Sequence, residues 1–209
     1  MEKNDDKEMT IAGFYSPEYE RFVEPFKQMC DNLSADSFKV HPFLLSVSWE
    51  DTEKTDLYKE LMEKANNRSG GWQKKLRESM MFWKCSVIQM ALALKNGNDL
   101  CLYLDIDTRV DSINWLPPQD IDVGFFDNPV TTHKNRISAG WLWFRRGEGS
   151  RTFVDCWKAN QKAKLHEHNG LTRTIKVTAP ANGVRLKNVT GSLNVTWNGF
   201  DDTREQVSQ

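Results

Sequence analysis

The sequence lacks the features that mark membrane-spanning, metal-knuckle and secreted disulfide-rich proteins. No run approaches the roughly 18 apolar residues that cross a bilayer, and the charged first eight residues differ from the apolar stretch of a signal peptide. The four cysteines include no Cys-x-x-Cys pair, which excludes a zinc knuckle or a redox motif and favours reduced, buried thiols. We therefore expect a cytoplasmic protein, or one domain of a longer anchored protein.

The sequence also has little net charge. Lys and Arg number 28 and Asp and Glu number 29, and a net charge of -1 creates no general attraction for nucleic acid or a membrane surface. Acidic residues are interspersed among the basic residues Lys134, Arg136, Arg145, Arg146 and Arg151, which indicates a solvated face. Any anion site is therefore local, and we expect no nucleic-acid partner and no membrane span.

What the sequence does contain is an alternation of strand-like and helix-like segments. The strand-like segments are 9–14, 38–47, 100–104, 121–126, 137–145, 184–189 and 193–197. The helix-like segments are 17–32, 52–65, 72–95 and 150–165, the last with Ser150 as its N-cap. This order predicts an α/β fold with a mostly parallel central sheet flanked by helices. We expect one domain over 1–209, with flexible ends at 1–8 and 202–209.

Two carboxylates follow the most apolar of these segments. Asp105 and Asp107 come directly after Leu100-Cys101-Leu102-Tyr103-Leu104, a run typical of a strand buried on both faces. Ligands of open α/β sheets bind beyond the carboxyl ends of the strands, where this pair falls. Carboxylate oxygens suit Mg²⁺ or Mn²⁺, ions that keep open positions for phosphate oxygens. The pattern predicts a site for a metal-bound diphosphate.

The segment around these carboxylates resembles a known motif. Leu102-Tyr103-Leu104-Asp105-Ile106-Asp107 is similar to the DxD motif of the GT-A-fold glycosyltransferases, the nucleotide-diphospho-sugar transferases, in their compact bacterial and viral forms. The preceding helix with Trp83-Lys84 and the strand 137–144, with its small residues and Gly140, are also similar to that family. The resemblance covers roughly residues 9 to 175. It implies a GT-A (Rossmann-like) fold and a cofactor of Mn²⁺ or Mg²⁺.

The resemblance also implies the reaction and the donor site. A hexose, deoxyhexose or pentose would pass from a UDP-sugar to a saccharide or glycoconjugate acceptor. Asp107 would bind the metal directly, and Asp105 would contact the ribose, or the metal through water. Ile106 lies in the same nucleotide-sugar segment. The family's first strand, which cradles uracil and ribose, corresponds here to Ala12, Gly13, Phe14 and Tyr15. Tyr15 is placed to stack on the base, and core packing is the alternative for Phe14 and Tyr15.

Two further groups of residues are candidates for contact with the donor. Arg77 and Lys84 lie seven residues apart on one face of the predicted helix, from which both can reach a diphosphate; solvated surface charge is the alternative for both. Gly140 leaves room for a sugar to approach the backbone. Trp141 and Trp143 alternate along their strand and so point to one face, where we expect Trp141 to contact the sugar.

The acceptor side offers two candidate catalytic carboxylates. An inverting transferase needs a general base near the acceptor hydroxyl. Glu167 is similar in position to the family's acidic segment, although His166 and His168 flank it in place of the usual acidic pair. Asp127 is the second candidate, and a turn residue is its alternative.

Two other functions are compatible with the same residues. Haloacid-dehalogenase-like phosphatases also place Asp-x-Asp after an apolar strand and use the first Asp as nucleophile, which would be Asp105 here. Arg109 stands where that family has Thr or Val, and about 100 residues precede the motif, whereas it usually opens the chain. A carbohydrate- or nucleotide-binding domain without turnover is the other alternative.

Overall fold

The structure is a computed structural model that describes residues 8–36, 39–66, 83–94, 99–127, 137–164, 167–196 and 200. Of the ends expected to be flexible, 1–7 and 202–209 lie outside these ranges, and Glu8 begins the first strand. Among the described residues no helix combines the length and apolar character needed to cross a membrane.

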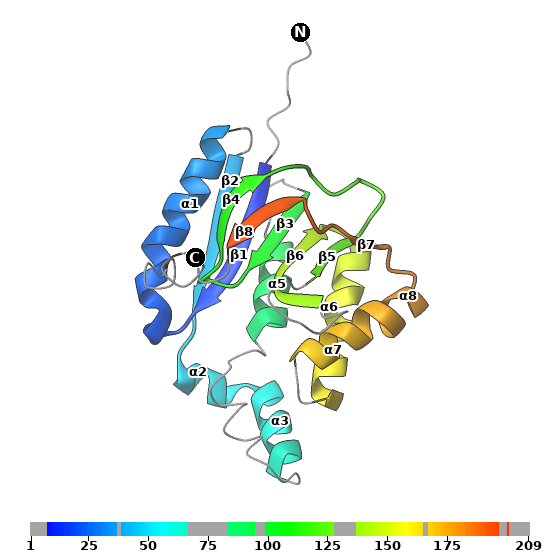
Figure 1. Cartoon of the computed structure of the whole chain (residues 1–209). Coiled ribbons are helices and arrows are strands. Elements are labelled where there is room, and N and C mark those ends of the chain that lie inside the picture. Colours follow the sequence, from blue (N-terminus) through cyan, green and yellow to red (C-terminus); the bar gives the residue numbers. More distant parts are fainter. Residues whose placement is uncertain are drawn as a thin grey trace, which may run out of the picture.

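A six-stranded sheet forms the centre of the molecule, with the order β2-β1-β3-β6-β5-β7 (Figure 1). All described neighbours in this sheet are parallel except β6, which runs antiparallel to β3 and β5. The mostly parallel α/β sheet predicted from the sequence is therefore confirmed. The strands are β1 (Glu8–Tyr15), β2 (Lys39–Ser46), β3 (Leu100–Leu104), β5 (Val123–Asp127), β6 (Ile137–Arg145) and β7 (Leu186–Asn188).

Helices cover both faces of this sheet (Figure 1). One face carries α1 (Val23–Asp36), which follows the 3-10 turn η1 (Pro17–Phe22), and a separate ribbon of β4 (Arg109–Ile113) and β8 (Leu193–Thr196). The opposite face carries α5 (Trp83–Ala93), α6 (Glu148–Lys164), α7 (Glu167–Arg173), the π-helix η2 (Thr174–Thr178) and α8 (Ala179–Ala181). In Figure 1, α2 (Trp49–Lys54) and α3 (Asp56–Asn66) extend from the end of the sheet at which β1 and β3 terminate.

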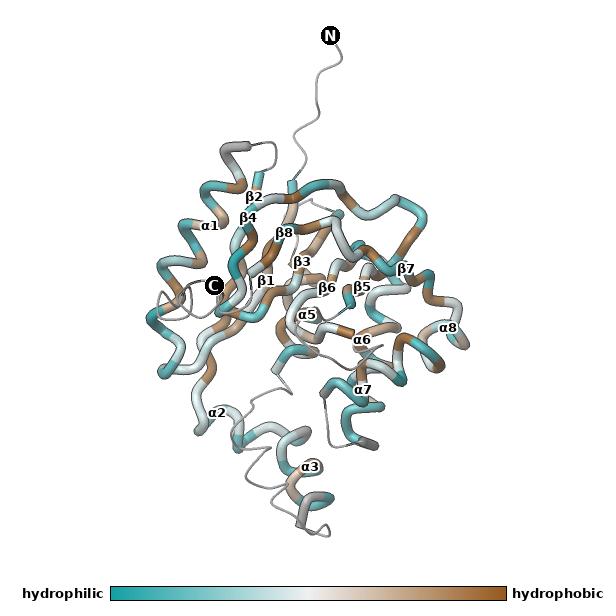
Figure 2. Tube along the Cα trace, viewed as in Figure 1, coloured by the Kyte–Doolittle hydropathy of each residue, from teal (hydrophilic) through white to brown (hydrophobic). Residues whose placement is uncertain are grey.

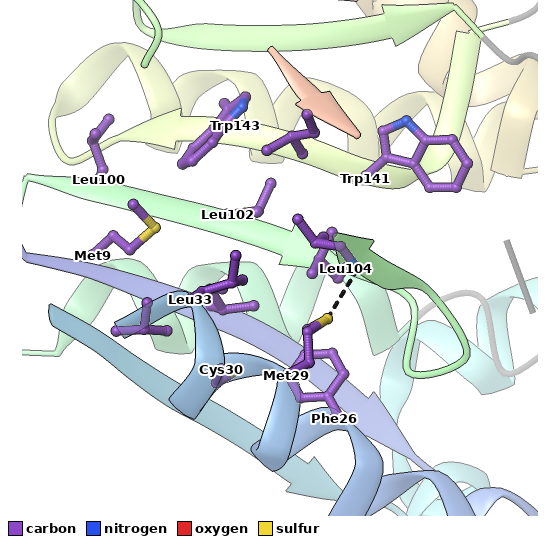
Figure 3. Close-up of a cluster of buried hydrophobic side chains, with 14 of the residues drawn as sticks. Met9, Phe26, Met29, Cys30, Leu33, Leu100, Leu102, Leu104, Trp141 and Trp143 are labelled. Carbon is purple, nitrogen blue, oxygen red and sulfur yellow. Dashed lines mark hydrogen bonds between the residues drawn. The ribbon is translucent and has the colours of Figure 1, made fainter. Parts of the chain in front are cut away.

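The core has two halves because side chains alternate across the sheet. On β3, Leu102 and Leu104 face α1, whereas Cys101 and Tyr103 face α5 and α6. Figure 3 shows the first half, in which Met29 of α1 also accepts a hydrogen bond from the Val110 amide of β4 at 3.0 Å. The tube of α1 in Figure 2 alternates between hydrophilic and hydrophobic colours along its length. This alternation is expected of a helix with one side exposed to solvent and the other side buried in the core.

The predicted helices and strands agree best with those of the structure where the chain is most apolar. The bounds of β3 and β6 coincide with the predicted segments 100–104 and 137–145. Pro42 lies within β2, which is an edge strand of the described sheet and so tolerates a residue without an amide hydrogen. The helix predicted over 52–65 is two helices, because Thr55 adopts an extended conformation between α2 and α3.

Three sequence predictions are wrong. Ser150 is not an N-cap: it lies inside α6, where its hydroxyl donates to the carbonyls of Asp122 and Arg145. Arg151 is exposed, but the predicted solvated face does not extend to Arg145 and Arg146, which are half-buried and donate to backbone carbonyls. All four cysteines are free, as expected, but Cys156 is half-buried, not buried. Lys134 and Arg136 lie outside the described residues.

Candidate functional site

The two carboxylates stand at the carboxyl edge of the sheet, as the sequence predicts. Asp105 follows β3 directly, and its amide donates to the Gly140 carbonyl of β6 at 2.7 Å. The Thr108 amide donates back to the Asp105 carbonyl at 2.9 Å and closes a turn over residues 105–108. Ile106, which stands between the two aspartates in the sequence, is buried in the core and is 6% exposed. This geometry fixes the backbone that carries Asp105 and Asp107.

The side chain of Asp105 is held by two groups from the sheet and the helix behind it. Lys84 of α5 places its Nζ 2.8 Å from Oδ1 and 2.9 Å from Oδ2 of Asp105. The same ammonium donates to the Ala139 carbonyl at 3.1 Å. Tyr103 donates its hydroxyl to Asp105 Oδ1 at 2.9 Å. The Lys84 side chain is only 9% exposed, so this is a largely buried ion pair.

Gly140 lies beside this pair for a reason that the sequence did not indicate. A Cβ atom built on Gly140 would lie 2.9 Å from Asp105 Oδ2, closer than a real side chain comes. The space that glycine leaves on β6 is therefore used by the carboxylate of Asp105. Room for a sugar at Gly140 stays a prediction.

Asp107 has an unusual electrostatic environment. Burial and the neighbouring negative charge of Asp105 raise the pKa of Asp107 to about 6, from an ordinary value of 3.8. A cation bound between the two carboxylates would offset the effect of the Asp105 charge on Asp107. Within the described ranges, however, no group of three or more His, Cys, Asp and Glu residues is arranged to hold a metal. Asp105 and Asp107 alone would leave the remaining positions of a bound metal to water or substrate oxygens.

The predicted uracil and ribose cradle lies beside this turn, on the adjacent strand β1. Ala12 pairs with Tyr103 of β3 and is fully buried. A Cβ atom on Gly13 would lie 2.9 Å from the Leu104 carbonyl, so glycine permits the close approach of β1 and β3. Phe14 and Tyr15 are half-buried and pack against opposite halves of the core. All four residues thus stand at the same edge as Asp105.

The tryptophans of β6 belong to the core. Trp141 is 4% exposed and Trp143 is 1% exposed, and both lie on the α1 side of the sheet (Figure 3). The expected shared face is confirmed. Trp143 donates its Nε1 hydrogen to Ser192 at 3.2 Å. Contact of Trp141 with a sugar stays a prediction, and its indole is almost entirely covered in this structure.

The remaining predicted site residues are Arg77, Glu167 and Asp127. Arg77 and His166 lie outside the described residues, and Glu167 begins α7 with a side chain that is also outside them. His168 Nδ1 lies 3.4 Å from the Ile137 carbonyl. Asp127 ends β5 at the same edge of the sheet as Asp105, is exposed, and accepts a hydrogen bond from Asn188 at 3.0 Å. The structure therefore brings Lys84, Asp105, Asp107, Gly140 and the end of β1 together.

Tyr103 is the residue that sequence reasoning missed. It is fully buried, and its hydroxyl reaches the carboxylate two residues further along the chain. A signal for it was present, because residues two apart on a strand share a face and a buried tyrosine hydroxyl needs an acceptor.

Comparisons with known proteins give structural but not sequence neighbours. No protein-family model matches the sequence, and no curated protein matches it. A solved glycosyltransferase involved in the glycosylation of the major capsid of PBCV-1 is similar, with a TM-score of 0.56 and 12% identity over 86% of this chain and 80% of that chain. The glycosyltransferase GlyE of Streptococcus pneumoniae TIGR4 is also similar, with a TM-score of 0.51 and 12% identity over 89% of this chain. Its apo form gives a TM-score of 0.50 over 88% of this chain.

The match to GlyE is partial in length, since the chain spans 45% of it. At 12% identity these likenesses concern the fold alone. The element order, the mostly parallel sheet and these neighbours agree with the predicted fold. The chain therefore has the GT-A type of α/β fold that the sequence predicted.

Proposed function

We propose that the chain is a glycosyltransferase. It would move a hexose, deoxyhexose or pentose from a UDP-sugar to a saccharide or glycoconjugate acceptor, with Mn²⁺ or Mg²⁺ at the Asp105-x-Asp107 turn. The observation that carries the proposal is the pair of carboxylates at the carboxyl edge of β3, where sheets of this kind bind ligands. The glycosyltransferases of similar fold support it.

Asp105 and Asp107 would have different roles in binding the donor. Asp107 would bind the metal directly, and Asp105, held by Lys84, would support it or contact the ribose. When bound, the metal neutralises the negative charge that develops on the departing nucleoside diphosphate. Ala12, Gly13, Phe14 and Tyr15 end the strand beside this turn and would form the nucleoside cradle.

A general base would activate the acceptor hydroxyl. Glu167 at the start of α7 and Asp127 at the end of β5 are the two candidates for a general base. Asp127 accepts a hydrogen bond from Asn188, which restricts the position of its carboxylate. Glu167 remains the first candidate because of its position in the family-like segment.

A phosphatase that uses Asp105 as nucleophile fits less well. Lys84 and Tyr103 both engage the carboxylate of Asp105: Oδ1 accepts from both, and Oδ2 accepts from Lys84. A nucleophile needs an unobstructed oxygen aimed at the phosphorus.

Thermal unfolding with nucleotides tests the proposal. A saturating concentration of UDP with Mn²⁺ is expected to raise the melting temperature by about 5 °C, because a ligand that binds only the folded state stabilises it. Release of free UDP from a UDP-sugar in the presence of acceptor then separates a transferase from a binding domain. No stabilisation by any nucleoside diphosphate, with or without metal, would refute the proposal.

A further inference from the structure

Tyr103 differs from the other residues of its strand in chemistry. β3 otherwise consists of three leucines and a cysteine, and all five residues are buried. A hydroxyl placed in such an apolar environment is costly unless it is hydrogen-bonded. Its acceptor is Asp105 Oδ1, at 2.9 Å, and the aromatic ring lies 5.8 Å from Lys84 Nζ. The phenol therefore connects the core to the candidate site.

The contacts of Asp105 determine how much of its carboxylate is available to a ligand. A carboxylate has about four lone pairs on its two oxygens. Oδ1 accepts from Tyr103 and faces Lys84, and Oδ2 also accepts from Lys84. Among the described residues Lys84 is the one donor to Oδ2, so that oxygen keeps room for one further hydrogen bond. Gly140 lies against that oxygen, where no side chain would fit.

We propose that Tyr103 is a positioning residue for the donor site. Its phenol and the Lys84 ammonium orient Asp105 so that the carboxylate presents one open lone pair, on Oδ2, to an O–H group of the ligand. That group is a hydroxyl of the nucleotide sugar or a metal-bound water. Asp105 then supports the ligand, and direct coordination is left to Asp107. The inference rests on the proposed function and adds the residue that sets the orientation of Asp105.

The test is the Tyr103→Phe variant, which keeps the ring and removes only the hydroxyl. We expect its affinity for UDP in the presence of Mn²⁺, measured by calorimetry, to be about tenfold lower than that of the unaltered protein, because the bond lost is to a charged group. Ser192→Ala is the matched control: it removes the acceptor of the Trp143 hydrogen bond on the opposite side of the sheet. Ser192→Ala is expected to lower the melting temperature and leave UDP affinity unchanged.

A double-mutant cycle separates positioning from general destabilisation. In the Asp105→Asn background the charged acceptor is gone, so adding Tyr103→Phe is expected to change UDP affinity by about twofold or less. A tenfold loss in both backgrounds, or no loss in either, would overturn the inference. If the unaltered protein does not bind UDP with Mn²⁺, the proposed function fails. If it binds and Tyr103→Phe binds equally well, only the positioning role fails.

Discussion

Gly140 and Asp105 are in contact across the boundary between β6 and the turn that follows β3. A Cβ atom on Gly140 would lie 2.9 Å from Asp105 Oδ2, and the Gly140 carbonyl accepts the Asp105 amide at 2.7 Å. The backbone contact and the missing side chain act together. The carboxylate occupies its position because residue 140 has no side chain.

The first prediction concerns Gly140→Ala. The added methyl group is expected to displace the carboxylate of Asp105, to cost about 1–2 kcal/mol in the free energy of unfolding, and to lower UDP affinity roughly tenfold. Urea unfolding and calorimetry measure the two effects. Gly147→Ala is the control, since a Cβ atom on Gly147 meets nothing within 4 Å. Equal UDP affinity of Gly140→Ala and the unaltered protein would show that the carboxylate has no role in binding.

The second prediction concerns the ion pair. Lys84→Met leaves the Asp105 carboxylate without its counter-charge, and we expect a loss of about 2 kcal/mol in unfolding free energy. This value lies below the usual range for buried pairs because the Asp105 side chain is 28% exposed. The comparison is Lys54→Met, which breaks the exposed pair with Glu50 and is expected to cost less than about 0.5 kcal/mol. Similar losses for the two variants would contradict the structural role of Lys84.

The third prediction is a pH dependence that originates at Asp107. Its pKa is about 6 in the folded chain and ordinarily 3.8, so the folded state holds the proton more tightly than the unfolded state. The resulting stability is fully present below pH 3.8 and is lost as the pH rises through 6. Asp107→Asn removes this loss, so without metal the variant is expected to be more stable than the unaltered protein at pH 8, by an amount on the order of 1–3 kcal/mol.

Urea unfolding in a metal chelator between pH 4 and pH 8 checks this pH dependence. The difference between the Asp107→Asn variant and the unaltered protein should shrink towards zero at the acid end. A difference in unfolding free energy that stays constant from pH 4 to pH 8 would show that the pKa of Asp107 is not raised. A metal also needs the ionised carboxylate, so UDP binding with Mn²⁺ is expected to weaken below pH 6.

The parts of the fold that the sequence predicts are those with strong local patterns. The bounds of β3 and β6 follow from continuous apolar runs between polar residues. β4 was missed because its sequence, Arg-Val-Asp-Ser-Ile, contains two charged residues and is stabilised by pairing with β8, whose residues lie 80 or more positions further along the chain. Ser150 was assigned as a cap because serine is typical there, whereas its hydroxyl bonds to two carbonyls that only the tertiary fold brings near.

The same distinction applies to the site. The place of Asp105 and Asp107 follows from a local pattern, a buried strand with two carboxylates at its end. The partner of Lys84 cannot be predicted from a local pattern. Helix periodicity indicates which side of α5 Lys84 occupies, but not which group lies opposite Lys84. Asp105 lies 21 residues further along the chain, and the contact depends on how α5 packs on the sheet. The role of Gly140 was hidden for the same reason, since its neighbour Oδ2 comes from another strand's end.

The most direct test of the glycosyltransferase proposal is the effect of Mn²⁺ on UDP affinity in the unaltered protein and in Asp107→Ala, measured by calorimetry at pH 7.5. We expect Mn²⁺ to increase the affinity of the unaltered protein at least about tenfold, and to have no effect on Asp107→Ala, because the variant lacks the direct metal ligand. The variant should unfold at a temperature no lower than that of the unaltered protein, since it removes a repelled charge. An equal gain from Mn²⁺ in both proteins, or no UDP binding by the unaltered protein, would contradict this account.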